Sequence, residues 1–144
     1  NRPVIGFSLA LIADARNADE LAFVLGHEAA HHISGHIPKR QEQALSGALL
    51  AGVMAQASGL SPDEVKAAQN LGAEVAARRY SKDLELEADA LGAEISLVAG
   101  FDPLRGTGFF DRLPDPGDKF LGSHPPNSAR KAQVAATVRR LQGS

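Results

Sequence analysis

The sequence predicts a mainly α fold, because helix-start signals and apolar residues at helical spacing recur along most of its 144 residues. A helix-capping side chain comes directly before an apolar series at Asn17, at Ser61 and at Ser81. Only the stretch from Val4 to Phe7 is short, apolar and typical of a strand. We therefore expect at most a small edge sheet near the N-terminus, followed by a helical stretch from Leu9 to Arg16.

The first long helix has a clear start and a clear end. Asn17 is followed three residues later by Glu20, a pair that forms a capping box directly before an apolar series. We expect a helix from about Ala18 to Gly35. It should end there because Pro38 disfavours helical geometry at the residue before it.

The segment from Gln43 to Pro62 contains no charged residue and is rich in Ala, Gly and Leu. Its strongly apolar part is shorter than the roughly 20 residues that a membrane-spanning helix requires. A buried or groove-lining helix is therefore our first expectation for residues 43–62. The alternatives are an interfacial helix that contacts a membrane or a partner protein and, last, a membrane span.

Four further helices are expected in the second half of the chain. The stretch Ser61-Pro62-Asp63-Glu64 combines a cap, a first-turn proline and two acidic residues at the positive end of the helix dipole. The expected helices run from this signal to about Arg79, from Lys82 to Ala99 after the cap Ser81, over a short stretch from Asp102-Pro103, and from about Ser128 to Leu141. A loop from Pro114 to Gly122 and a rigid turn from Ser123 to Asn127 should precede the last helix.

Composition and charge limit the classes of protein to which this chain can belong. With 44% hydrophobic residues the chain can bury a core, so we expect residues 1–144 to form one domain. The net charge of -2 comes without a dense basic surface, which argues against nucleic acid as a partner. Cysteine is absent, so any metal must be held by histidine and carboxylate side chains. The absence of cysteine fits both reducing and oxidising cellular compartments and does not decide between them. The stretch from Asn1 to Ile12 lacks the features of a leader, so we expect a mature or trimmed product.

The residues His27-Glu28-Ala29-Ala30-His31 form an HExxH motif on the first long helix. Because residues four apart share one helix face, both imidazoles can bind one ion. A catalytic zinc site takes three protein ligands and leaves a fourth position for water. Glu28 lies about 100° around the helix from His27, where its carboxylate can reach that water as general base. The alternative, two ordinary surface histidines, requires a chance match on the order of one in a hundred or rarer.

The third ligand is expected from a separate helix downstream. Glu85 is the best candidate, and Asp89, four residues later, shares its helix face. Glu85 can then bind zinc while Asp89 accepts the free ring N–H of a ligand histidine. Glu87 points elsewhere, and the alternative for the whole segment is a solvated acidic face. We expect structural or solvent-facing roles for His32 and His36, which do not share the face of the motif histidines well.

Three segments, in the same order along the chain, carry a resemblance to a known family. They are Asp19-Glu20-Leu21-Ala22-Phe23-Val24-Leu25-Gly26-His27-Glu28-Ala29-Ala30-His31, Tyr80-Ser81-Lys82-Asp83-Leu84-Glu85-Leu86-Glu87-Ala88-Asp89, and Ser123-His124-Pro125-Pro126 with Arg130. The chain resembles the gluzincin peptidases related to the CAAX prenyl endopeptidases, the HtpX-type proteases and the periplasmic quality-control metalloproteases. The resemblance implies a zincin-like α+β fold, mainly α, in which the HExxH helix packs against a second ligand-bearing helix.

The resemblance also implies roles for individual residues. One Zn²⁺ per chain would be held by His27, His31 and Glu85, with Asp89 supporting a ligand histidine. His124 becomes an active-site candidate that donates to the oxyanion or caps the zinc as a self-blocking fourth ligand, against the alternative of a turn histidine.

Arg130 follows His124 by six residues, as the corresponding arginine does in the family. It could orient His124 or contact substrate, and the alternative is a solvated helix residue. The resemblance favours the bacterial periplasm or a membrane-associated location, and it leaves the oligomeric state open.

Two functional hypotheses follow. The first is a zinc-dependent endopeptidase that hydrolyses peptide bonds of unfolded or membrane-associated proteins by zinc-activated water, with Glu28 as general base. The second is a zinc-stabilised, chaperone-like binding module that holds such polypeptides with latent or no protease activity. The uncharged stretch 43–62 is the best support for the second.

Overall fold

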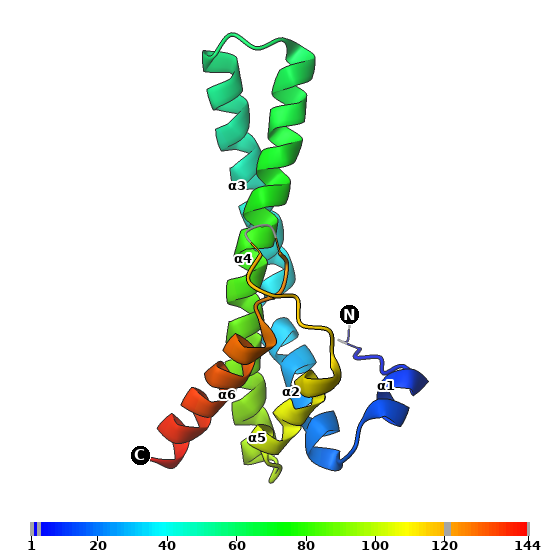
Figure 1. Cartoon of the computed structure of the whole chain (residues 1–144). Coiled ribbons are helices and arrows are strands. Elements are labelled where there is room, and N and C mark those ends of the chain that lie inside the picture. Colours follow the sequence, from blue (N-terminus) through cyan, green and yellow to red (C-terminus); the bar gives the residue numbers. More distant parts are fainter. Residues whose placement is uncertain (1, 3, 120–121, 144) are drawn as a thin grey trace.

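The computed structural model describes residues 2, 4–119 and 122–143, and the elements in this part of the chain are all helices (Figure 1). They are α1 (Leu9–Asp14), α2 (Ala18–Ile33), α3 (His36–Ala57), α4 (Pro62–Val98), α5 (Pro103–Gly106), the 3₁₀ helix η1 (Thr107–Arg112) and α6 (Asn127–Gln142). The mainly α fold is thus confirmed. The expected strand from Val4 to Phe7 is wrong, because the described residues hold no second strand with which it could pair. Part of the predicted loop 114–122 lies outside the described residues.

The longest element, α4, has 37 residues and a length of about 55 Å. It forms an antiparallel hairpin with α3 at one end, while α2, α5 and α6 gather around its other end (Figure 1). The sequence predicted two helices here, separated near Ser81, and this is wrong. Ser81 lies inside the continuous helix, where its hydroxyl donates to the Ala77 carbonyl at 2.8 Å. A serine that bonds the preceding turn in this way does not interrupt a helix.

The start of α2 agrees with its sequence signal. The Asn17 side chain accepts from the Glu20 backbone N–H at 3.0 Å, as a helix cap does. The end of α2 is a sharp turn at Gly35, which has the positive φ of 63° that glycine adopts without strain. Because Pro38 lies in the first turn of α3, where its missing N–H costs nothing, a new helix starts directly after the turn.

Two pairs of glycines allow α4 to approach its neighbours closely. A Cβ atom on Gly47 of α3 would collide with the Gly72 carbonyl of α4, and a Cβ atom on Gly72 would collide with Gly47 in return. Gly26 and Gly92 form the same kind of contact between α2 and α4, since a Cβ atom on Gly26 would lie 2.7 Å from the Gly92 carbonyl oxygen. The second contact brings the backbone of α2 against α4 at the position of the HExxH motif.

The apolar stretch 43–62 lies in α3 and in the turn that follows. Within α3, only Gly52 and Ala55 of this stretch are buried, together with His36 near the helix start. The large apolar side chains of its outer face are exposed, namely Leu45, Leu49, Leu50, Val53 and Met54. The expectation of a buried helix is therefore wrong for this face, because α4 covers α3 from one side. No helix in the described residues is long and apolar enough to span a membrane.

A small apolar core joins α2, α4, η1 and α6. Its members are Phe23, Ala93, Phe110, Val134 and Val138. The rings of Phe23 and Phe110 meet edge to face with their centroids 5.7 Å apart, a favoured aromatic geometry. This core places α6 beside α4 and thereby brings the first turn of α6 to the HExxH helix.

A buried ion pair ties η1 to the start of α2, and its loss should destabilise the fold. Arg112 donates to the two carboxylate oxygens of Glu20 at 2.9 and 2.6 Å, and Glu20 is only 2% exposed. We expect Glu20→Ala to lower the free energy of unfolding by about 3 kcal/mol, because it leaves the Arg112 charge with only the exposed and more distant Asp14 carboxylate, 3.6 Å away. Urea denaturation measures this loss. The control Glu74→Ala removes an exposed ion pair with Arg78 and should cost less than about 1 kcal/mol.

Acid should abolish the same stabilisation. The hydrogen bond from Arg112 lowers the pKa of Glu20, so the contribution is complete above the unfolded value of about 4.3 and is lost as the pH falls through the folded value. The difference in unfolding free energy between wild type and Glu20→Gln should therefore shrink in acid. A difference that stays constant down to the lowest pH would contradict this account.

Candidate metal centre

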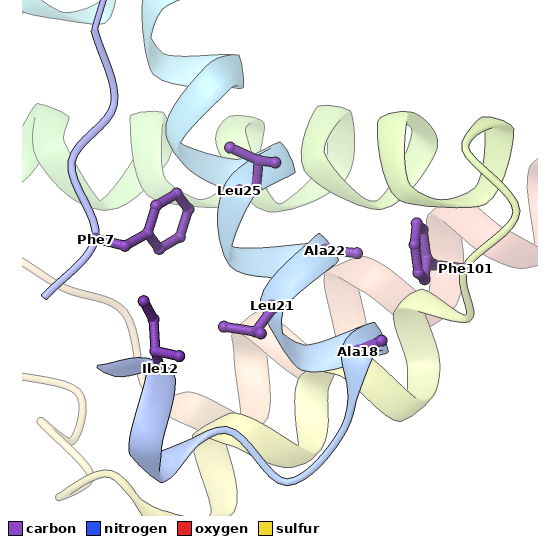
Figure 2. A pocket seen from close by; sticks show the side chains of 7 residues that line it. All are labelled: Phe7, Ile12, Ala18, Leu21, Ala22, Leu25 and Phe101. Carbon is purple, nitrogen blue, oxygen red and sulfur yellow. The ribbon is translucent and has the colours of Figure 1, made fainter. Parts of the chain in front are cut away.

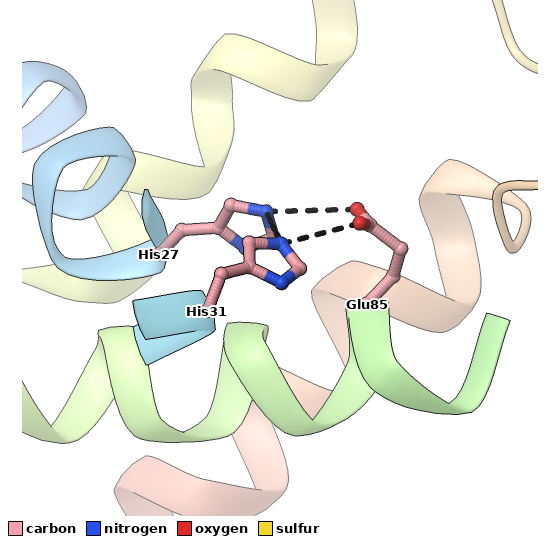
Figure 3. A group of neighbouring side chains, drawn as sticks. All are labelled: His27, His31 and Glu85. Atoms are coloured by element: carbon pink, nitrogen blue, oxygen red, sulfur yellow. Dashed lines mark hydrogen bonds and ion pairs between the residues drawn. The ribbon is translucent and has the colours of Figure 1, made fainter. Parts of the chain in front are cut away.

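Three side chains from two helices converge at the crossing of α2 and α4. The candidate ligand atoms of His27, His31 and Glu85 all lie within 4.8 Å of one another (Figure 3). The two histidine Nε2 atoms are 3.0 Å apart. The Glu85 carboxylate faces both of them, with 3.5 Å from Oε2 to His27 Nε2 and 3.2 Å from Oε1 to His31 Nε2. The sequence pattern that grouped these three residues therefore corresponds to a compact cluster in space.

The surroundings keep Glu85 ionised. Burial opposes its charged form, but the hydrogen bond with His31 and the electrostatic interactions with His27 and Arg130 outweigh burial and lower the pKa of Glu85 to about 2. The same hydrogen bond raises the pKa of His31. At neutral pH this carboxyl is thus an anion that faces two imidazole nitrogens, as a ligand for a divalent cation must be.

The ring of His27 is held from behind by a buried carboxylate. Asp89 is fully buried, and its Oδ1 lies 2.9 Å from His27 Nδ1. Arg130, from the first turn of α6, donates to both oxygens of Asp89 at 2.7 Å. The guanidinium group also lies 3.4 Å from Glu85 Oε2 and sits over the ring of Phe110. The Arg130 side chain is 11% exposed, so it is not a solvated helix residue.

The ring of His31 has a different partner, which the sequence analysis did not single out. His36 is 3% exposed, and its Nδ1 lies 2.8 Å from His31 Nδ1. Burial lowers the pKa of His36 and favours its neutral form. Its other nitrogen, Nε2, is 3.5 Å from the nearer oxygen of Glu87. The only sequence signal for this contact was that His36 follows His31 by five residues, with a glycine between them. Helical periodicity could not predict the contact, because it does not relate residues on the two sides of a turn.

The remaining candidates border the cluster. Glu28 and His31 line a cavity of about 220 Å³ together with His36 and Glu85. Glu28 also lines a second cavity, of about 180 Å³, beside His32 and the N-terminal segment at Phe7. His124 lies in the loop before α6, with its Nδ1 3.6 Å from Glu85 Oε2 and with 57% of its side chain exposed.

A separate apolar pocket of about 430 Å³ lies along the start of α2. In Figure 2, Phe7 and Ile12 face Leu21 and Leu25, and Phe101 lies beside Ala22 on the other side of α2. Its lining contains no metal-ligand side chain. Phe7 lines both this pocket and the cavity beside Glu28, so the two hollows adjoin along α2.

The residues of the cluster fit a single divalent cation. Both Nδ1 atoms have partners, at Asp89 and at His36, and the two Nε2 atoms face the same carboxylate. Two imidazole nitrogens and one carboxylate oxygen are the donor set of the His₂Glu zinc peptidases. The cluster thus has the donor set of a metallopeptidase centre.

The chain belongs to peptidase family M48, whose model matches residues 2–138. It is 30% identical over 115 residues to a protein of Vibrio cholerae serotype O1 that is named as a beta-barrel assembly-enhancing protease. It is 29% identical over 120 residues to the mitochondrial metalloendopeptidase OMA1 of Arabidopsis thaliana. These matches cover 73% and 81% of this chain but only 23% and 24% of the relatives. No solved structure matches the chain significantly.

Proposed function

We propose that residues 1–144 form the single catalytic domain of a zinc-dependent endopeptidase. The observation that carries this proposal is the convergence of the His27, His31 and Glu85 ligand atoms within 4.8 Å, with Glu28 on the wall of the adjoining cavity. Membership of a metallopeptidase family supports a metal at this cluster. The donor set of two imidazoles and one carboxylate supports zinc, with one ion per chain.

Each residue around the cluster has a separate role in the proposed peptide hydrolysis. A zinc ion held by His27, His31 and Glu85 would supply a Lewis acid that lowers the pKa of water and polarises the substrate carbonyl. Glu28 follows His27 directly on α2, and its exposed carboxylate borders the cavity in which the peptide would lie. Glu28 takes the proton of the attacking water and passes it to the leaving amine.

Asp89 and Arg130 act on the metal site through His27. Asp89 Oδ1 and Arg130 Nη2 lie 2.9 and 3.3 Å from His27 Nδ1. When His27 binds a metal through Nε2, its Nδ1–H would donate to Asp89 Oδ1. Arg130 fixes the Asp89 carboxylate from the other side with two hydrogen bonds of 2.7 Å. We therefore assign Arg130 to the orientation of Asp89, in place of the contact with His124 or substrate that the sequence suggested.

His124 is a further candidate for the reaction, because its Nδ1 lies 3.6 Å from Glu85 Oε2. Its exposed ring can donate to the oxyanion or block the metal as a fourth ligand. His124→Ala separates the two roles in a casein assay: lower turnover supports oxyanion stabilisation, and higher turnover supports a self-blocking ligand. Unchanged turnover would remove His124 from the site.

The proposed substrates are unfolded or membrane-associated polypeptides. The exposed apolar face of α3 supports this choice, because it offers a surface for the apolar segments that such substrates expose. The same face supports the second candidate, a zinc-stabilised chaperone-like module that binds polypeptides, a partner protein or a membrane surface through residues 43–62 without cutting.

Metal removal tests the proposal. We expect the purified chain to contain one zinc per molecule by elemental analysis and to digest casein. Casein digestion should stop when a chelator removes the zinc and return when zinc is added back. A zinc-loaded chain that retains casein uncut, and still does so as His124→Ala, would favour the binding module. A chain that takes up no zinc would overturn both candidates.

A further inference from the structure

The partner of His31 is brought to it by a local turn. Gly35 lies between the two histidines and has a φ of 63°, so the helix is interrupted there and a new helix, α3, begins at His36 and continues along α4 (Figure 1). The two rings consequently meet at a steep angle with their centroids 4.9 Å apart. A nitrogen–nitrogen distance of 2.8 Å is a hydrogen bond, in which one Nδ1 donates and the other accepts.

The direction of this hydrogen bond follows from the geometry of the cluster. His31 turns its Nε2 toward His27 and Glu85, so a metal at the cluster would bind that atom. A neutral histidine that binds a metal through Nε2 carries its proton on Nδ1. His31 Nδ1–H therefore donates to His36 Nδ1, and the neutral His36 ring then carries its own proton on Nε2.

The carboxylate that faces this second nitrogen is that of Glu87. The buried Nε2 of His36 lies 3.5 Å from Glu87 Oε1 and has no nearer hydrogen-bond partner. This distance is an electrostatic contact, longer than an ordinary hydrogen bond, to a side chain that is 50% exposed. The Lys39 ammonium group, 3.8 Å from the same oxygen, holds the carboxylate on this side of α4.

We propose that His36 and Glu87 are positioning residues that hold His31 in the tautomer with a free Nε2, as Asp89 does for His27. This inference rests on the proposed metal site and adds residues that do not bind the metal themselves. Each ligand histidine thus has its own carboxylate, reached directly in one case and through a neutral imidazole in the other. The sequence analysis did not include Glu87 in the site. It is the carboxylate at the end of the second series of contacts, which runs from His31 through His36.

Zinc affinity, measured by competition with a chromophoric chelator, tests the proposal without an activity assay. We expect His36→Phe, which keeps an aromatic ring but removes the acceptor, to raise the zinc Kd by about 10–100-fold. His36→Gln should restore part of the affinity, because its amide oxygen can accept from His31 Nδ1–H. Glu87→Ala, at a half-exposed position where the fold should tolerate it, should raise the Kd by a smaller factor. The control Glu94→Ala, another half-exposed carboxylate of α4, should leave the Kd unchanged.

Histidine tautomers distinguish a failure of this proposal from a failure of the proposed function. Long-range ¹H–¹⁵N spectra at alkaline pH, where the imidazoles are neutral, should show His31 protonated at Nδ1 and His36 protonated at Nε2. If the chain bound no zinc but showed these tautomers, the proposed function would fail and the positioning pair would stand. The zinc Kd could instead be the same for wild type, His36→Phe and Glu87→Ala. That result would contradict the positioning role of His36 and Glu87 but not the metal site. The opposite tautomers would also overturn it.

Discussion

Glu28→Gln is expected to retain zinc and to lower casein turnover by about 10²–10⁴-fold. The amide has the shape of the carboxylate but cannot take a proton from water. Glu28 belongs to none of the ion pairs that hold His27, His31 and Glu85 together, so the cluster should stay intact. The expected effect is therefore a loss of kcat at full zinc occupancy.

The measurement is kcat on casein beside zinc content by elemental analysis. Glu42→Gln is a matched control, since Glu42 is an exposed carboxylate on the neighbouring α3 and lines none of the cavities described above. It should leave kcat and zinc content unchanged. If Glu28→Gln kept full turnover, Glu28 would not be the general base, even if the metal site remained.

Glu85→Ala is expected to abolish both zinc binding and turnover. Loss of a direct ligand should weaken zinc binding by more than the roughly 10–100-fold that loss of an outer partner costs. The variant also removes the only carboxylate oxygens that face the Nε2 atoms of both histidines among the described residues. The metal would then be left with two imidazole ligands.

Equilibrium dialysis against zinc, followed by the casein assay, checks this outcome. Asp83→Ala is the control, because Asp83 is an exposed carboxylate two residues earlier on the same helix. It should bind zinc with the wild-type Kd. Zinc bound by Glu85→Ala with wild-type affinity would show that the third ligand lies elsewhere and would end the proposed assignment.

The grouping of His27, Glu28 and His31 could be predicted because it depends on the helix period alone. The sequence also predicted the start of α2 at Asn17 and its end near Gly35, since such signals belong to a few consecutive residues. The reason given for the end was wrong, because Ile37 and Pro38 lie in the first turn of α3. The sequence misplaced a helix boundary at Ser81. A capping residue is only a local preference, and tertiary packing along α3 extends α4 through it.

The site as a whole required the tertiary structure. The Gly26–Gly92 contact sets how closely α2 approaches α4, and so decides that Glu85 faces the two Nε2 atoms while Asp89 reaches the back of His27. The turn at Gly35 and the packing of α3 on α4 decide that His36 lies between His31 and Glu87. The sequence by itself determined the residues that share one helix face, because that spacing is short-range. Only the fold decided which faces meet, because such contacts depend on backbones that approach from distant parts of the chain.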